Sequence, residues 1–86
     1  MQILVPTPLR SYTGGSSEVE ASGSTLAEVL AHLDATYPGI RFRMIDEQDR
    51  VREHIRFFVD GELVQDLEAL VAAQAPVQIV CALSGG

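Results

Sequence analysis

The sequence predicts an α+β domain in which a mixed β-sheet curls over one main helix, with a second, shorter helix beside it. Near both ends of the chain, apolar and polar residues alternate with the period of a strand. Between them, residues 25–37 repeat their apolar positions with the spacing of a helix. The chain has 86 residues, of which 47% are hydrophobic, enough for one modest core.

The first strand is predicted at the start of the chain, where two sets of side chains alternate: Met1, Ile3 and Val5 against Gln2 and Leu4. Two prolines follow and end it, because proline lacks the N–H that a sheet needs. Residues 9–13 are expected to be irregular, and the glycines and serines at 14–17 to form a turn. The alternating segment 18–22 then predicts a second strand, in a hairpin with the first.

The clearest helix begins after Thr25. Thr25 and Glu28 have the spacing of a capping box, in which each side chain accepts a hydrogen bond from a backbone amide at the helix start. Pro38 ends the helix, because proline disfavours a helical residue before it. One apolar stripe should face a sheet: Leu26, Val29, Leu30, Leu33 and Tyr37.

The middle of the chain is less regular. Residues 40–45 fit a short helical turn and an irregular strand equally well. Residues 46–49 are polar and predict a turn, and residues 50–52 a short edge strand blunted by its arginines.

A second hairpin is predicted from residues 55–59 and 62–64, joined by Asp60-Gly61, a pair that favours a two-residue turn. Residues 66–73 are expected to form two helical turns, and an apolar strand follows from residue 77. This order of elements is that of a β-grasp, in which the last strand pairs in parallel with the first.

In such a sheet the inward and outward side chains of each strand alternate. Met1, Ile3, Val5, Phe57, Val77 and Ile79 should face the helix. Leu4, Phe58 and Val80 should then point outward, and we expect them to be exposed together as an apolar docking surface for a partner. Ala82, Leu83 and Ser84, which lead to the end of the chain, are expected to contact the same partner.

The sequence ends in Gly85-Gly86, two residues without side chains that can enter a channel too narrow for any other residue. We therefore expect a domain over residues 1–83 and a flexible tail over residues 84–86. The reactive group of the tail would be the α-carboxylate of Gly86.

Composition limits the partners. The net charge is −6, and all six basic residues are arginine, which argues against a nucleic-acid partner and favours an electropositive protein. No apolar run approaches the length of a membrane span, and we expect a cytoplasmic protein without a membrane partner. The single cysteine, Cys81, allows no internal disulfide and is expected to be a core residue.

Several of these features together resemble a known family. The start of the chain and its Leu83-Ser84-Gly85-Gly86 end are similar to ubiquitin. The capped helix with its Tyr37-Pro38-Gly39 stop, and the Phe57-Phe58-Val59-Asp60-Gly61-Glu62 hairpin, resemble the prokaryotic sulfur carriers of the MoaD/ThiS family, nearer to MoaD and the cysteine-biosynthetic carriers than to ThiS. The chain departs from the family at Cys81, where many members carry proline, and at Ser84, which replaces a common alanine.

The resemblance implies that this protein is a substrate of other enzymes. A ThiF/MoeB-like enzyme would use ATP and Mg²⁺ to adenylate the Gly86 carboxylate, and a sulfur source would convert the adenylate to a thiocarboxylate. Gly85, which has no side chain, would let the tail enter a narrow channel of the enzyme, and a synthase would accept the sulfur. The carrier itself would bind no cofactor and no metal. The pathway that receives the sulfur stays open among molybdopterin, thiamin, cysteine and a specialised metabolite.

Two other functions fit the same tail. The chain could be a ubiquitin-like modifier that is conjugated to other proteins through Gly86. It could also be a β-grasp binding subunit without chemistry, in which Gly85-Gly86 has no role.

Overall fold

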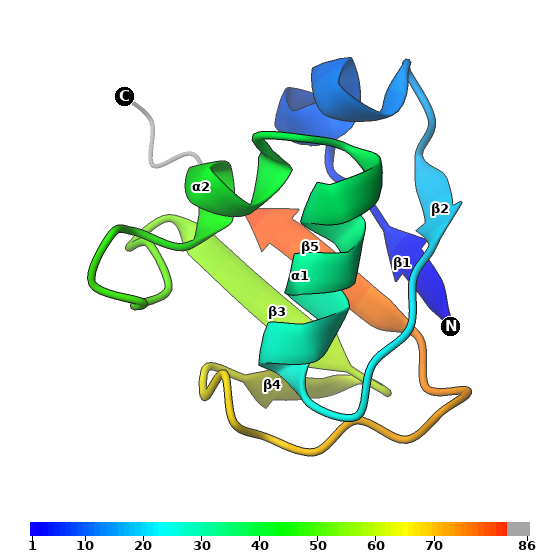
Figure 1. Ribbon diagram of the computed structural model, residues 1–86, viewed down its shortest axis with the longest axis vertical. Coiled ribbons are helices and arrows are strands. Elements are labelled where there is room, and N and C mark those ends of the chain that lie inside the picture. The colour runs from blue at the N-terminus through cyan, green and yellow to red at the C-terminus, as the bar shows by residue number, and fades with distance from the viewer. Residues whose placement is uncertain (83–86) are drawn as a thin grey trace.

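Two strands of the sheet come from the start of the chain and three from residues 55–81, and the first and last of the five lie side by side (Figure 1). A computed structural model describes residues 1–82. The strands are β1 (Gln2–Leu4), β2 (Glu18–Glu20), β3 (Ile55–Val59), β4 (Glu62–Val64) and β5 (Val77–Cys81). They lie in the order β2-β1-β5-β3-β4, with β5 parallel to β1 and every other pair antiparallel. This confirms the predicted β-grasp.

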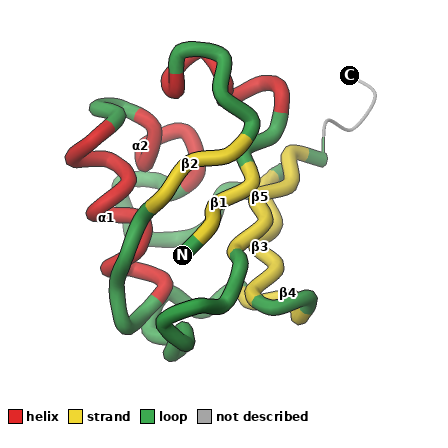
Figure 2. Tube along the Cα trace, turned by 90° about the vertical axis from the view of Figure 1, so that its right-hand side faces the viewer, coloured by secondary structure: helices red, strands yellow, loops and turns green. Residues whose placement is uncertain are grey.

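Helix α1 (Leu26–Thr36) lies across one face of the sheet, and the short helix α2 (Ile40–Met44) lies on the same side (Figure 2). The predicted stripe packs on the sheet: Leu26, Val29, Leu30 and Leu33 are fully buried, and Tyr37 is partly buried against them. Phe57 is the largest fully buried side chain and extends from β3 into this core. Burial of these apolar groups is what holds the helix, because a helix of this length is not stable alone.

The start of α1 is capped as predicted, with one shift. The Thr25 hydroxyl accepts from the Glu28 amide at 3.2 Å. The Glu28 carboxylate accepts from the amide of Ser24 at 2.8 Å, one residue before the position that a standard capping box uses.

The predicted helix over residues 66–73 is wrong. The carbonyls of Ala69 and Leu67 instead accept hydrogen bonds from the Leu26 and Ala27 amides at the start of α1, at 3.0 and 2.8 Å. The first amides of a helix have no partner within it, so this loop satisfies groups that would otherwise be left unpaired. The second short helix of the fold is α2, in the segment whose sequence fits a helical turn and an irregular strand equally well.

Two further segments differ from expectation. Residues Thr7–Thr13 form a 3₁₀ helix, η1, where an irregular loop was predicted, and Pro8 lies in its first turn, where a missing N–H is harmless. Residues 50–52 form no strand of the sheet, because only Val51 pairs, in a single bridge with Ile45.

The turn predicted just before residues 50–52 is confirmed: the Asp46 carboxylate accepts hydrogen bonds from the amides of Gln48 and Arg50 at 2.9 and 3.0 Å. The Arg50 hydrogen bond is the main reason that the pKa of Asp46 is lowered.

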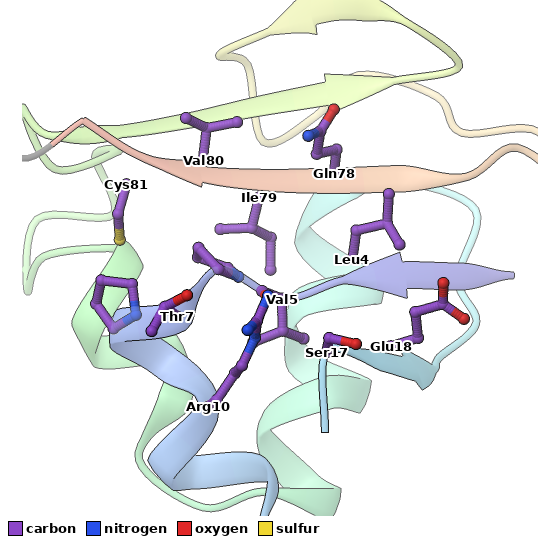
Figure 3. A pocket seen from close by; sticks show the side chains of 12 residues that line it. Leu4, Val5, Thr7, Arg10, Ser17, Glu18, Gln78, Ile79, Val80 and Cys81 are labelled. Atoms are coloured by element: carbon purple, nitrogen blue, oxygen red, sulfur yellow. The ribbon is translucent and has the colours of Figure 1, made fainter. Parts of the chain in front are cut away.

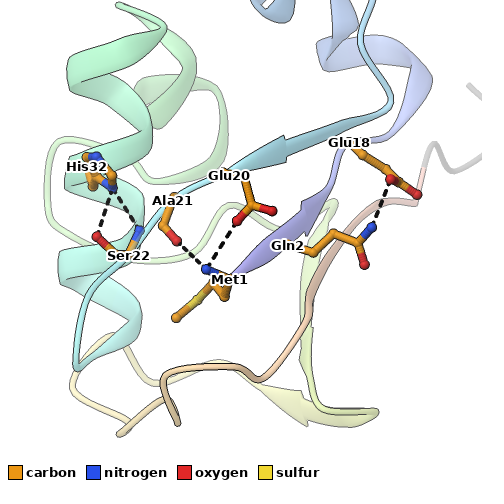
Figure 4. Close-up of polar contacts among 7 residues, drawn as sticks. All are labelled: Met1, Gln2, Glu18, Glu20, Ala21, Ser22 and His32. Atoms are coloured by element: carbon orange, nitrogen blue, oxygen red, sulfur yellow. Dashed lines mark hydrogen bonds and ion pairs between the residues drawn. The ribbon is translucent and has the colours of Figure 1, made fainter.

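The two hairpins are fixed in different ways. Between β3 and β4, Asp60 and Gly61 both have positive φ, at 51° and 85°, as a type I′ turn requires. The hairpin of β1 and β2 has a longer connection, and polar contacts hold its open end (Figure 4). There the Met1 ammonium donates to the Ala21 carbonyl at 2.8 Å and lies 3.3 Å from the Glu20 carboxylate.

Candidate functional site

The end of β5 is the part of the fold that leads to the predicted tail. β5 lies at the centre of the sheet, and its pairing with β3 continues one residue beyond the strand, because the Ala82 amide donates to the His54 carbonyl at 2.7 Å. Leu83, Ser84, Gly85 and Gly86 lie outside the described residues. The sheet therefore fixes the position of the last residue before them.

Leu4, Phe58 and Val80 lie on the face of the sheet turned away from α1, as predicted. Leu4 and Phe58 are both opposite Gln78 in the strand register, and Val80 is the next outward residue of β5. All three side chains are half-buried, whereas the sequence predicted that they would be exposed. The structure brings them onto one surface; whether they bind a partner stays a prediction.

Two residues of this open face were missed. Gln78 is exposed between Leu4 and Phe58, so a polar amide lies at the centre of the apolar group. Leu63 is directly opposite Phe58, and 56% of its surface is exposed. The two-residue turn at Asp60-Gly61 already fixes this pairing, so the register could have been counted from the sequence.

A groove lies beside the end of β5, where β1 no longer pairs with it (Figure 3). β1 ends at Leu4, and Val5 donates instead to the Ser17 carbonyl at 2.8 Å. The Arg10 side chain is fixed at the groove by a hydrogen bond of 3.0 Å from its Nε to the Val5 carbonyl. The lining mixes apolar and polar groups: Leu4, Val5, Pro6, Thr7, Pro8, Arg10, Ser17, Glu18, Gln78, Ile79, Val80 and Cys81.

Cys81 ends β5 and is half-buried against the core. Burial raises the pKa of its thiol, and the positive charge of Arg43 offsets part of that rise. A raised pKa keeps the thiol protonated at neutral pH, and the thiolate is the nucleophilic form. The environment of Cys81 therefore suits packing better than catalysis.

Other groups in residues 1–82 offer no second chemical centre. His32 has a structural contact, because its Nδ1 accepts from the Ser22 amide at 2.7 Å (Figure 4). The described residues contain no cluster of three His, Cys, Asp or Glu side chains that could hold a metal ion. None of the helices in this part of the chain is long and apolar enough to span a membrane.

Comparison with known proteins gives consistent matches over nearly the whole chain. The sequence profile of the ThiS family matches residues 3–86. The sulfur carrier protein CysO of Mycobacterium tuberculosis is 37% identical over 89 residues, which cover 98% of this chain and 96% of that protein.

Two solved structures have the same fold. A chain of the Amycolatopsis orientalis BexX/CysO complex superimposes with a TM-score of 0.92 at 33% identity, covering 99% of this chain and 98% of the other. The crystal structure of M. tuberculosis CysO gives a TM-score of 0.90 at 33% identity, covering 95% of this chain and 98% of the other.

Proposed function

The chain belongs to the ThiS family, and from this premise we propose that it is a sulfur carrier that transports sulfur as a thiocarboxylate on Gly86. The observation that supports the proposal most directly is the course of β5. A central strand, paired on both sides, leads to Ala82, and four residues later the sequence reaches Gly85-Gly86. The sheet thus fixes the residue from which this end of the chain continues.

The chemistry requires a separate enzyme. An α-carboxyl group has a pKa near ~3.5 and is ionised at neutral pH, so it is a poor electrophile. An adenylating enzyme of the ThiF/MoeB type would bind ATP and Mg²⁺. A carboxylate oxygen of Gly86 then attacks the α-phosphorus of ATP, and the bond to pyrophosphate breaks. A sulfide equivalent attacks the acyl carbon of the adenylate, the bond to AMP breaks, and the thiocarboxylate forms.

We further propose that the open face of the sheet docks on this enzyme, through Leu4, Phe58 and Val80 together with Ala82, Leu83 and Ser84. Half-burial of the three sheet residues leaves apolar surface that the fold itself does not cover, and Leu63 extends it. The chain 37% identical to this one is named a sulfur carrier protein, and a structural relative was solved in complex with BexX. These matches support a carrier that works by docking on other proteins.

Deletion of Gly86 tests the proposal. The deletion moves the terminal carboxylate back by about 3.5 Å, out of reach of the α-phosphorus in the enzyme. We expect ATP–pyrophosphate exchange to fall to background, with an unchanged circular dichroism spectrum. Gln74→Ala is the control, because it changes an exposed position outside both the tail and the proposed docking residues, and it should keep exchange near the wild-type rate. Near-normal exchange after the deletion would refute the proposal.

A further inference from the structure

Positive charge is concentrated in one part of this acidic protein. Five of the six arginines lie between residues 41 and 56, in α2, the following loop and β3. Two of them are paired with carboxylates of this loop: Arg41 lies 3.3 Å from the Asp49 carboxylate, and Arg50 lies 3.8 Å from that of Asp46. Arg43 and Arg52 take part in none of the ion pairs formed among residues 1–82.

Arg52 lies over an exposed aromatic ring, and Arg43 lines the same hollow. Phe42 has 55% of its surface exposed, and the guanidinium carbon of Arg52 is 4.6 Å from the centre of its ring. The Nε of Arg52 also donates to the Phe42 carbonyl at 2.8 Å, so the guanidinium is held in place over the ring. Four residues line a hollow here, and we call them the arginine–phenylalanine surface: Phe42, Arg43, Arg52 and His54.

This surface has the composition of an interface rather than of an ordinary solvated face. Aromatic residues and arginine are enriched at protein interfaces and among the residues that contribute most to binding, and here an exposed phenylalanine and two arginines line one hollow. The Arg52 side chain is already ordered by its contacts with Phe42, so little conformational entropy would be lost when a partner binds it. The acidic Glu53 lies between Arg52 and His54 in the sequence but does not line the hollow.

The arginine–phenylalanine surface adjoins the end of β5. The His54 carbonyl accepts the hydrogen bond from the Ala82 amide, and the charge of Arg43 acts on the Cys81 thiol. Four extended residues span at most about 14 Å, so an enzyme that acts on Gly86 has to come that close to Ala82. The arginine–phenylalanine surface therefore lies where such an enzyme would make contact, and its residues are different from those of the open face.

We propose that the arginine–phenylalanine surface binds an acidic segment of the enzyme that adenylates Gly86. Carboxylates on the partner would pair with Arg43 and Arg52, which have no such partner among the described residues. The inference rests on the proposed function for the identity of the partner.

The test compares two double variants in ATP–pyrophosphate exchange with a ThiF/MoeB-type enzyme, with the carrier as the varied substrate in one series and ATP in a second. Arg43→Gln/Arg52→Gln removes two positive charges from the surface. Gln65→Glu/Gln74→Glu changes the net charge by the same amount at two exposed positions elsewhere. Arg43→Gln alone is the safeguard for folding, because the Arg43 side chain makes no hydrogen bond within residues 1–82.

We expect the arginine double variant to raise the KM for the carrier roughly tenfold at low salt, with kcat unchanged. The difference should shrink as salt is added, because salt screens exposed charges. Arg43→Gln should raise KM in the same direction by a smaller factor, and the glutamine double variant should stay within about twofold of wild type.

Three results would overturn the inference. The first two are an unchanged KM for the carrier in the arginine variants and an equal rise in KM in the glutamine control. The third is a rise in the KM for ATP alone, which would mean that the surface recognises nucleotide phosphates. Failure of the proposed function would give a different result from these three: the wild-type carrier itself would support no exchange. The inference would then be wrong as well.

Discussion

Phe57 and Phe58 are neighbours in β3, yet their side chains lie on opposite faces of the sheet and in different surroundings. Phe57 is fully buried among the residues under α1, whereas Phe58 is half-buried on the open face opposite Leu63. The same alternation runs through β1 and β5, where Ile3, Val77 and Ile79 are buried and Leu4, Gln78 and Val80 lie outside. One face of these strands thus holds the fold together, and the other leaves apolar surface available for a partner.

Truncation of the inner residue should have the largest effect on stability. Phe57→Ala leaves a cavity in the core and should lower the free energy of unfolding by ~3–5 kcal/mol. Phe58→Ala, the same change one residue along, should lower it by less than about half as much, because part of that side chain is already exposed. Urea denaturation of both variants measures the difference. Equal losses would show that the two faces contribute alike to the fold.

A charge on the open face should affect binding instead of folding. Phe58→Asp should weaken binding to the adenylating enzyme by ~2 kcal/mol or more, as loss of an apolar anchor does. Titration calorimetry gives the affinity, and circular dichroism confirms that the variant is folded. Unchanged affinity in a folded variant would mean that the enzyme binds another surface, and the arginine–phenylalanine surface would then be the first candidate.

Cys81 lies on the inner side of β5 at its end, next to the tail. Its substitution therefore shows whether a residue at this position serves the fold or the chemistry of the tail. Cys81→Ala should lower the free energy of unfolding by only ~1 kcal/mol, since the side chain is small and half-buried. Thiocarboxylate formation should be unaffected. A variant with a normal melting curve that no longer transfers sulfur would give the thiol a chemical role that its environment does not suggest.

The sequence was most informative where a local pattern and the tertiary structure agree. Thr25 and Glu28 mark the start of α1, and Asp60-Gly61 fixes the second hairpin and its register. The parallel pairing of β1 and β5 followed from the order of elements, because the last strand has a place beside the first in a β-grasp.

Where prediction failed, distant residues decide the structure. Residues 66–73 have a helical pattern, but two of their backbone carbonyls accept hydrogen bonds from the start of α1, 40 and 43 positions earlier in the sequence. The half-burial of Leu4, Phe58 and Val80 depends on how the strands are packed across the sheet, which strand alternation alone does not give. The arginine–phenylalanine surface was missed because the ring of Phe42 and the guanidinium of Arg52 meet only once α2 has formed.

The intact mass of the protein is the most direct test of its function as a sulfur carrier. The purified chain would be incubated with the adenylating enzyme, ATP, Mg²⁺ and sulfide, and compared with the chain that lacks Gly86. We predict that the full chain gains the mass difference between sulfur and oxygen, located at Gly86 by fragmentation, and that the shortened chain gains nothing. A full chain that is adenylated but never gains this mass, or that is recovered linked through Gly86 to other proteins, would contradict it.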